Sequence, residues 1–228
     1  FSRHETVHDT IKVLERYVDL IVLRTFAHSH IEEVAEYASV PVINALTDDY
    51  HPCQGLADLL TIRQHKGTLQ GLKLAYVGDG NNMAHTYLLA GAIAGLDVAI
   101  ATPVGYEPQE AAVAQARELA TRYGTGSTFT VVSDAIEAVA GADVVVTDTW
   151  ASMGQEEEHA RRVLDFASYT VDDGLMAHAD SGAIFMHCLP AHRGEEVTDS
   201  VIDSARSVVF DEAENRLHAQ RAWMSLVL

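Results

Sequence analysis

The chain has 228 residues, of which 48% are hydrophobic and 21% are charged, with a formal net charge of −18. This composition is ordinary for a globular protein and excludes a disordered chain. The acidic balance argues against nucleic acid or an anionic membrane as a partner, and no apolar run reaches the length of a membrane span. Two cysteines are too few for a disulfide framework and favour a reducing compartment, most simply the cytoplasm.

The chain begins at Phe1 rather than at methionine. We interpret it as lacking an N-terminal part. Eight short apolar, β-branched segments follow and are predicted as strands: 19–25, 40–46, 72–79, 97–103, 128–134, 142–150, 183–190 and 207–213.

Helical patterns lie between these segments. Residues 107–124 place Val113, Ala116, Leu119, Ala120 and Tyr123 on one stripe, with Gly124 as the stop. Asp134 and Glu137 have capping-box spacing, and residues 51–67 are predicted as helical from about Gln54.

Strands that alternate with helices predict an α/β fold with parallel sheets and crossover helices. We expect two lobes, each a parallel sheet flanked by helices, with the active site in the cleft between them. The first lobe is predicted over 1–53 and the second over 54–212. The last helix, 213–228, is expected to dock on the first lobe.

Unusual polar residues follow the predicted strands, where ligands sit in parallel α/β sheets. The segments concerned are RTFAH, HPCQ, GDGNNM, DTWASMG, HCLPAHRG and DEAENR. Because these six segments each follow a predicted strand, they can converge on one cleft. GDGNNM resembles a dinucleotide loop, but Met83 holds the place of the third glycine, which disfavours an NAD-dependent enzyme. Asn81 and Asn82 could instead offer amide groups to a zwitterionic ligand.

Three interpretations of Cys188 compete: a small buried residue, a metal ligand, or a nucleophile with His187 as its base. The 12 histidines form no convincing cluster in the sequence. Adjacent residues on a strand point to opposite faces, so the pair with His187 has poor geometry. The residues alone favour a cysteine that lines a cleft and leave its role open.

The remaining polar residues also have two interpretations each. Asp148 is a helix cap or a carboxylate that orients an amine. Arg24 and Arg216 are surface ion-pair residues or an anion clamp. His51 begins a helix or donates to a carbonyl or phosphate oxygen.

Together, HPCQ, DTWASMG, HCLPAHRG and DEAENRLHAQ closely resemble the ornithine carbamoyltransferase family, over essentially the whole chain. An aspartate carbamoyltransferase is expected to show HPLP in place of HCLP. The resemblance implies that carbamoyl phosphate is bound by Arg24, His51, Gln54, Cys188, Leu189 and Arg216. It implies that ornithine is bound by Asn82, Asp148, Ser152 and Met153. The catalytic residues it implies are Asp148, Cys188, Arg24, His51 and Arg216.

The resemblance also implies that the amine of ornithine attacks the carbamoyl carbon, so that Cys188 is no covalent nucleophile and no metal or organic cofactor is required. It implies a homotrimer, or a multiple of trimers, in arginine metabolism, with arginine biosynthesis and the urea cycle as settings, and it leaves open whether the role is biosynthetic or catabolic. The family's S-x-R-T phosphate motif does not occur in these residues, and we expect it upstream of Phe1. The alternatives are another amine acceptor such as putrescine, or a catalytically incomplete ornithine-binding homologue.

Overall fold

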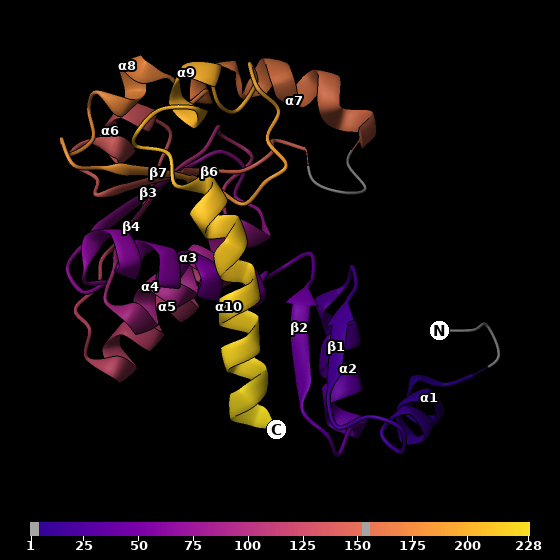
Figure 1. The fold of residues 1–228 in the computed structure, drawn as a ribbon. Helices are drawn as coiled ribbons and strands as arrows, with labels where there is room; N and C mark the ends of the chain where they lie inside the picture. The colour runs from indigo at the N-terminus through magenta and orange to yellow at the C-terminus, as the bar shows by residue number, and fades with distance from the viewer. Residues whose placement is uncertain (1–4, 152–155) are drawn as a thin grey trace.

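The computed structural model describes residues 5–151 and 156–228, which form two parallel β-sheets flanked by helices (Figure 1). The smaller sheet pairs β1 (Ile21–Arg24) with β2 (Val42–Leu46). The larger sheet has the strand order β5-β4-β3-β6-β7. Its strands are β3 (Lys73–Val77), β4 (Asp97–Ala101), β5 (Phe129–Val132), β6 (Val144–Thr147) and β7 (Ile184–His187). The predicted α/β class with parallel sheets is confirmed.

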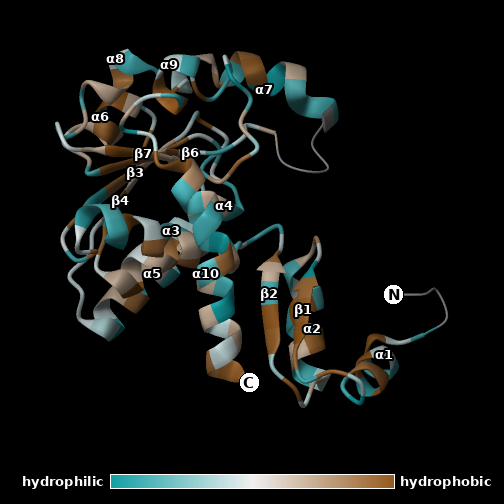
Figure 2. Cartoon of the chain, viewed as in Figure 1, coloured by the Kyte–Doolittle hydropathy of each residue, from teal (hydrophilic) through white to brown (hydrophobic). Residues whose placement is uncertain are grey.

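The smaller lobe also contains α1 (Val7–Leu14) and α2 (His28–Tyr37). Its strands align Ile21 with Val42 and Val22 with Ile43. The β1 strand alternates between half-buried and exposed residues, and 55% of the Val22 surface is exposed. Figure 2 shows both strands as largely hydrophobic, and part of this hydrophobic surface is therefore exposed in the smaller lobe.

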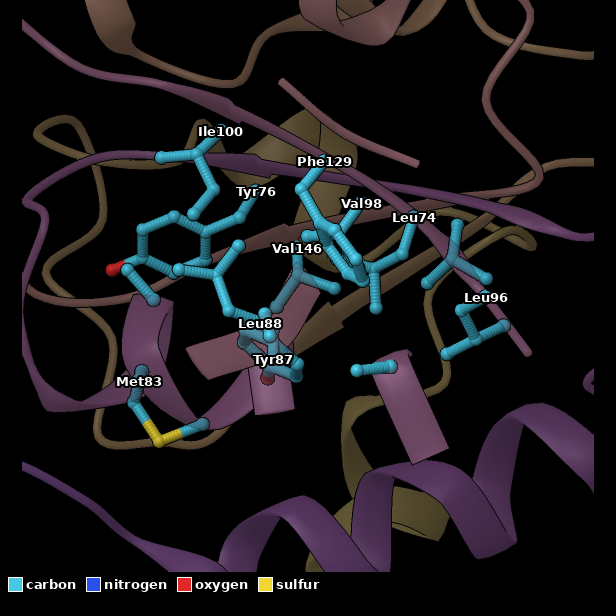
Figure 3. Packing of buried hydrophobic residues seen from close by; sticks show 14 of the residues in the cluster. Leu74, Tyr76, Met83, Tyr87, Leu88, Leu96, Val98, Ile100, Phe129 and Val146 are labelled. Carbon is cyan, nitrogen blue, oxygen red and sulfur yellow. The ribbon is translucent and has the colours of Figure 1, made fainter. Parts of the chain in front are cut away.

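Helices cover both faces of the larger sheet. One face packs on α4 (Asn82–Ala94) and α5 (Glu110–Tyr123), around buried side chains such as Tyr76, Leu88 and Ile100 (Figure 3). The other face packs on α6 (Ala135–Val139), α8 (Asp173–Met176) and α9 (Asp199–Ile202). Helix α7 (His159–Asp165) lies between two short 3₁₀ helices, Glu156–Glu158 before it and Ala167–Tyr169 after it. Burial on both faces accounts for the nearly continuous apolar strands.

Two further helices pack against each other where the lobes meet. Helix α3 (Pro52–Lys66) leads from the end of β2 into the larger lobe, and α10 (Val209–Val227) starts at the edge of β7 (Figure 1). Their contact brings together residues that are 154 positions apart, such as Asn215 and Thr61 at 2.8 Å. The proposed domain boundaries, with 213–228 assigned to the first lobe, remain a prediction.

One predicted strand is wrong. Residues 207–213 make a single parallel bridge, between Ser207 and Phe185, and the chain then enters α10 at Val209. Asp211 and Glu212 lie in the first turn of this helix, where negative charge is favourable. DEAENR therefore lies on a helix, and Arg216 does not follow a strand.

The α5 prediction is largely confirmed, since the helix ends at Gly124 in the left-handed conformation. Its buried residues are Ala112, Ala116 and Ala120. Tyr123, expected on the apolar stripe, is the last residue of the helix and is 55% exposed, so this part of the prediction is wrong. Asp134 caps α6 as predicted, and its side chain accepts from the Ile136 N–H.

Candidate active site

The ends of the strands and helices described above surround a cleft with a volume of about 430 Å³. Eight of the ten predicted site residues line it: Arg24, His51, Gln54, Asn82, Asp148, Cys188, Leu189 and Arg216. The other two, Ser152 and Met153, lie outside the described residues. Thr149 and Ala151, which precede them, line the same cleft. The structure thus brings together residues that are up to 192 positions apart in the chain, from Arg24 to Arg216.

One side of the cleft is cationic. Arg24 ends β1, and Arg216 projects from α10, where its Nη1 donates to Gln54 Oε1 at 2.7 Å. Gln54 itself lies fully buried in the first turns of α3. Two guanidinium groups beside a helix N-terminus form a suitable site for an anion.

His51 lies between these cations and is 7% exposed. Burial, followed by the positive charges of Arg216 and Arg24, lowers the pKa of His51 to about 3. Its Nδ1 is buried and has no hydrogen-bond partner among the described residues. His51 is therefore a neutral imidazole that lines the cleft.

The opposite side of the cleft carries a carboxylate and amides. Asp148 follows β6, and its Oδ1 accepts from the Thr149 N–H at 2.8 Å. Its Oδ2 accepts from Asn81 Nδ2 at 3.2 Å. Asn81 also caps α4 through its Oδ1, so both the oxygen and the nitrogen of its amide have partners within the protein. Asn82 donates to the Thr47 carbonyl at 2.9 Å and still lines the cleft.

Cys188 follows β7, and its thiol donates to Asp148 Oδ1 at 3.1 Å. Burial, then the negative charges of Asp148 and Glu212, raise the pKa of the Cys188 thiol well above its usual range. A thiol that keeps its proton is a poor nucleophile. A ring nitrogen of His187 lies within 4.8 Å of the Cys188 sulfur, but both ring nitrogens have other partners. Nε2 lies 3.1 Å from Glu196, and Nδ1 accepts from the Leu189 N–H, so His187 is not available as a base for the thiol.

The hydrogen bonds of His187 also weigh against a metal centre here. Asp148, His187 and Cys188 each offer one possible ligand atom, and these atoms lie within 4.8 Å of one another. A metal needs a ring nitrogen with a free lone pair. Since Nδ1 accepts from Leu189, Nε2 carries the proton that it donates to Glu196, and neither nitrogen is available.

The Gly78-Asp79-Gly80 turn has a structural role. A Cβ on Gly80 would lie 2.2 Å from the backbone nitrogen of Pro108, and the Gly80 N–H donates to the Tyr106 carbonyl. The second glycine is therefore required where two loops touch, and this turn leaves no room for a pyrophosphate at that point.

Sequence reasoning did not identify Arg162, which is buried on α7. Its Nη1 donates to Asp79 Oδ2 and to the Trp150 carbonyl, both at 2.8 Å. Arg162 thus ties the turn after β3 to the segment after β6. Asp48 and His192 also line the cleft without having been predicted. Asp48 lies just after a predicted strand, and this position could have revealed it.

No helix in the described part of the chain has both the length and the hydrophobicity needed to cross a membrane.

A cationic pocket lies opposite a carboxylate in the same cleft. This arrangement is typical of group-transfer enzymes that hold an anionic donor next to an amine acceptor.

Comparison with known proteins identifies the family within this class. Residues 70–227 match the family model of the aspartate/ornithine carbamoyltransferase Asp/Orn binding domain, and residues 1–64 match that of the carbamoyl-P binding domain. The chain belongs to the aspartate/ornithine carbamoyltransferase family.

Individual relatives agree with this assignment. Ornithine carbamoyltransferases from Anoxybacillus flavithermus and Carboxydothermus hydrogenoformans are 57% and 58% identical to the chain, which they match over 100% of its length and 72% of their own. The solved structure of the Pyrococcus furiosus ornithine carbamoyltransferase is 54% identical, with a TM-score of 0.94, over 99% of this chain and 71% of that one. The predicted family, fold and enzyme class, an ornithine carbamoyltransferase, are confirmed.

Proposed function

We propose that this chain transfers the carbamoyl group of carbamoyl phosphate to the side-chain amine of L-ornithine, giving L-citrulline and phosphate. The observation that carries the proposal is the cleft itself, in which Arg24, His51 and Arg216 face Asp148 and Cys188. A phosphate with a carbonyl group fits the cationic side, and an amine fits the carboxylate side.

In the proposed reaction, the neutral amine attacks the carbamoyl carbon and forms a tetrahedral intermediate. The bond from that carbon to the phosphate oxygen then breaks, and phosphate leaves with the proton released by the amine. Arg24 and Arg216 stabilise the charge on the phosphate. We assign His51, a neutral imidazole that lines the cleft, to the carbonyl oxygen, where its one ring N–H can stabilise the developing charge.

An amine with a reference pKa of about 10.4 is mostly protonated at neutral pH, and the site must favour the neutral form. We assign Asp148 and Cys188 to hold and orient the amine, and Asn82 to bind the amino-acid end together with Ser152 and Met153. We assign Gln54 to the carbamoyl phosphate side of the cleft, and Cys188 and Leu189 to the point where the two substrates meet. The thiol of Cys188 keeps its proton and serves as a hydrogen-bond donor.

We propose arginine biosynthesis as the metabolic setting. A Pyrococcus furiosus relative, 54% identical, is named an anabolic ornithine carbamoyltransferase. The homotrimer rests on the family resemblance, and a cytoplasmic location rests on the two free cysteines.

The proposal is tested on the full-length natural protein by measuring product formation from carbamoyl phosphate with ornithine, putrescine or aspartate offered in parallel. We expect ornithine to be the best acceptor. A higher kcat/KM with putrescine or aspartate contradicts the proposal.

A further inference from the structure

Two buried carboxyl groups lie behind the cleft and have no part in the chemistry proposed above. Asp58 on α3 and Glu212 on α10 are both fully buried, and the amide of Gln54 joins them. Gln54 Nε2 donates to Asp58 Oδ1 at 2.8 Å and to Glu212 Oε1 at 3.1 Å. Both amide hydrogens are therefore used. The amide oxygen accepts from Arg216 Nη1 at 2.7 Å.

This arrangement decides which way the Gln54 amide faces. The two ends of an amide are nearly equal in size, so its hydrogen-bond partners set its orientation. Two acceptors on one side and a guanidinium on the other leave one orientation in which every group is paired. A flipped amide would turn its hydrogens toward Arg216. The carboxyl groups therefore hold the guanidinium of Arg216 indirectly, through Gln54.

Glu212 also fixes the other side of the cleft. Its Oε2 accepts from the backbone N–H of His187 at 2.9 Å. His187 is the last residue of β7, and Cys188 follows it directly. One side chain thus contacts both the amide that holds Arg216 and the strand end that carries Cys188.

The pair holds a proton at neutral pH. Burial, then the charge of Asp58, raise the pKa of Glu212 well above its usual range, and burial raises the pKa of Asp58 to about 6. Tyr87 on α4 donates to Asp58 Oδ2 at 2.8 Å. The remaining groups that face the pair are Arg216 on α10, and Asp148 and Cys188 at the ends of β6 and β7. One neutral and one ionised carboxyl group leave a single negative charge near Arg216.

We propose that Asp58 and Glu212 act as one positioning pair, which orients Gln54 and thereby Arg216 toward the phosphate and holds the end of β7 in place. Neither carboxyl group is among the residues that line the cleft. The inference rests on the proposed function, because it gives the pair a role in that reaction.

The test compares Glu212→Gln, Asp58→Asn and the double variant in the full-length protein. In Glu212→Gln, the new side-chain amide has one acceptor oxygen, which cannot serve both Gln54 Nε2 and the His187 N–H. Losing one such hydrogen bond raises the KM for carbamoyl phosphate about tenfold, with a smaller change in the KM for ornithine. The double variant is no worse than the poorer single variant, because the pair acts as a unit. Glu212→Asp keeps both carboxyl oxygens, so its KM for carbamoyl phosphate should lie between those of the wild type and Glu212→Gln.

The pH profile adds a second readout. For the wild type, kcat/KM for carbamoyl phosphate falls as pH drops below about 6, the pKa of Asp58. Asp58→Asn lacks this limb. If kcat/KM of Asp58→Asn still falls below about pH 6, the proposal is contradicted. Asp58→Asn also provides the test of the proposal if Glu212→Gln does not fold.

Asn215→Ala is the matched control. Asn215 is buried on α10, and its Nδ2 donates to Thr61 at 2.8 Å and to Gln64 at 2.7 Å, both on α3. Its loss weakens the same interface, so the thermal midpoint falls while both KM values stay unchanged. If Glu212→Gln behaves like this control, the positioning role is wrong.

Binding of inorganic phosphate, measured by calorimetry on the same variants, does not depend on turnover. Suppose that the wild type forms no citrulline, but that Glu212→Gln binds phosphate about tenfold more weakly than the wild type. This result contradicts the proposed function and leaves the positioning pair intact. Equal phosphate affinity in the wild type and Glu212→Gln contradicts the positioning pair alone.

Discussion

The thiol of Cys188 donates a hydrogen bond to Asp148 Oδ1 at 3.1 Å, between the ends of two neighbouring strands, β6 and β7. A catalytic cysteine needs a cationic neighbour that draws the proton off its sulfur. Here a carboxylate keeps the proton on the sulfur instead. The two residues form one polar surface, a hydrogen-bond donor beside an acceptor, which suits the binding of an amine.

We expect Cys188→Ser to keep most of the activity, since serine can donate the same hydrogen bond to Asp148. Cys188→Ala, which cannot, should show a higher KM for ornithine and a lower kcat, yet remain active. Citrulline formation by both variants is the measurement. In the wild type, alkylation by iodoacetamide at neutral pH should be slower than that of free cysteine. A covalent carbamoyl adduct on Cys188, found by mass spectrometry, contradicts this prediction.

Asp148→Asn should lower kcat/KM for ornithine by about 10- to 100-fold, because a hydrogen bond to a charged group contributes about 1.5–3 kcal/mol. The KM for carbamoyl phosphate should change much less, since that substrate is assigned to the opposite side of the cleft. Steady-state kinetics with each substrate varied in turn measures the split. An equal loss for both substrates would show that Asp148 does not act on the amine side.

His51 makes stability depend on pH in a defined direction. Its pKa is lowered from 6.5 to about 3, so the unfolded chain binds a proton at a pH where the folded chain does not. Acidification from pH 6.5 toward 3 therefore favours unfolding, by about 1.4 kcal/mol per pH unit.

His51→Asn lacks this contribution. The free energy of unfolding of the wild type, minus that of the variant, should fall as the pH drops below about 6.5 and stay flat above about pH 7. Urea denaturation at several pH values measures it. A difference that does not change with pH shows that His51 is protonated in the folded protein.

Arg162→Leu should destabilise the protein by about 3–5 kcal/mol, because Asp79 would remain buried without its partner. Arg161→Leu is the matched control. The neighbouring arginine has an 81% exposed side chain, which forms a surface ion pair with Asp165, and its loss should matter little. Urea denaturation of both variants decides the point, and equal stabilities would rule out a structural role for the buried pair.

The same two arginines show why part of the structure could not be predicted. They are neighbours in the sequence, and nothing local separates them. Arg162 differs from Arg161 because Asp79, 83 positions away, lies against it in the fold. Likewise, the Asp58–Glu212 pair depends on the contact between α3 and α10, which no local pattern encodes.

What could be predicted rests on local signals and on sheet geometry. Seven of the eight predicted strands form, since short β-branched runs between helical patterns favour parallel strands. The eighth, 207–213, has the same composition, but its acidic residues stand where a helix begins. Asp148 and Cys188 could be predicted as cleft residues because ligands in parallel sheets bind at the carboxyl ends of strands, and these two residues lie at two such ends.

The close approach of Gly80 to the backbone of Pro108 has a consequence for reading such motifs. A glycine at this turn records that something passes within contact distance of the main chain. In a nucleotide-binding fold the group that approaches the glycine is a diphosphate, whereas here it is another segment of the backbone. Both cases exclude a side chain at this position and therefore select the same glycine. The glycine pattern thus indicates a close approach, and the structure is needed to identify the group that approaches.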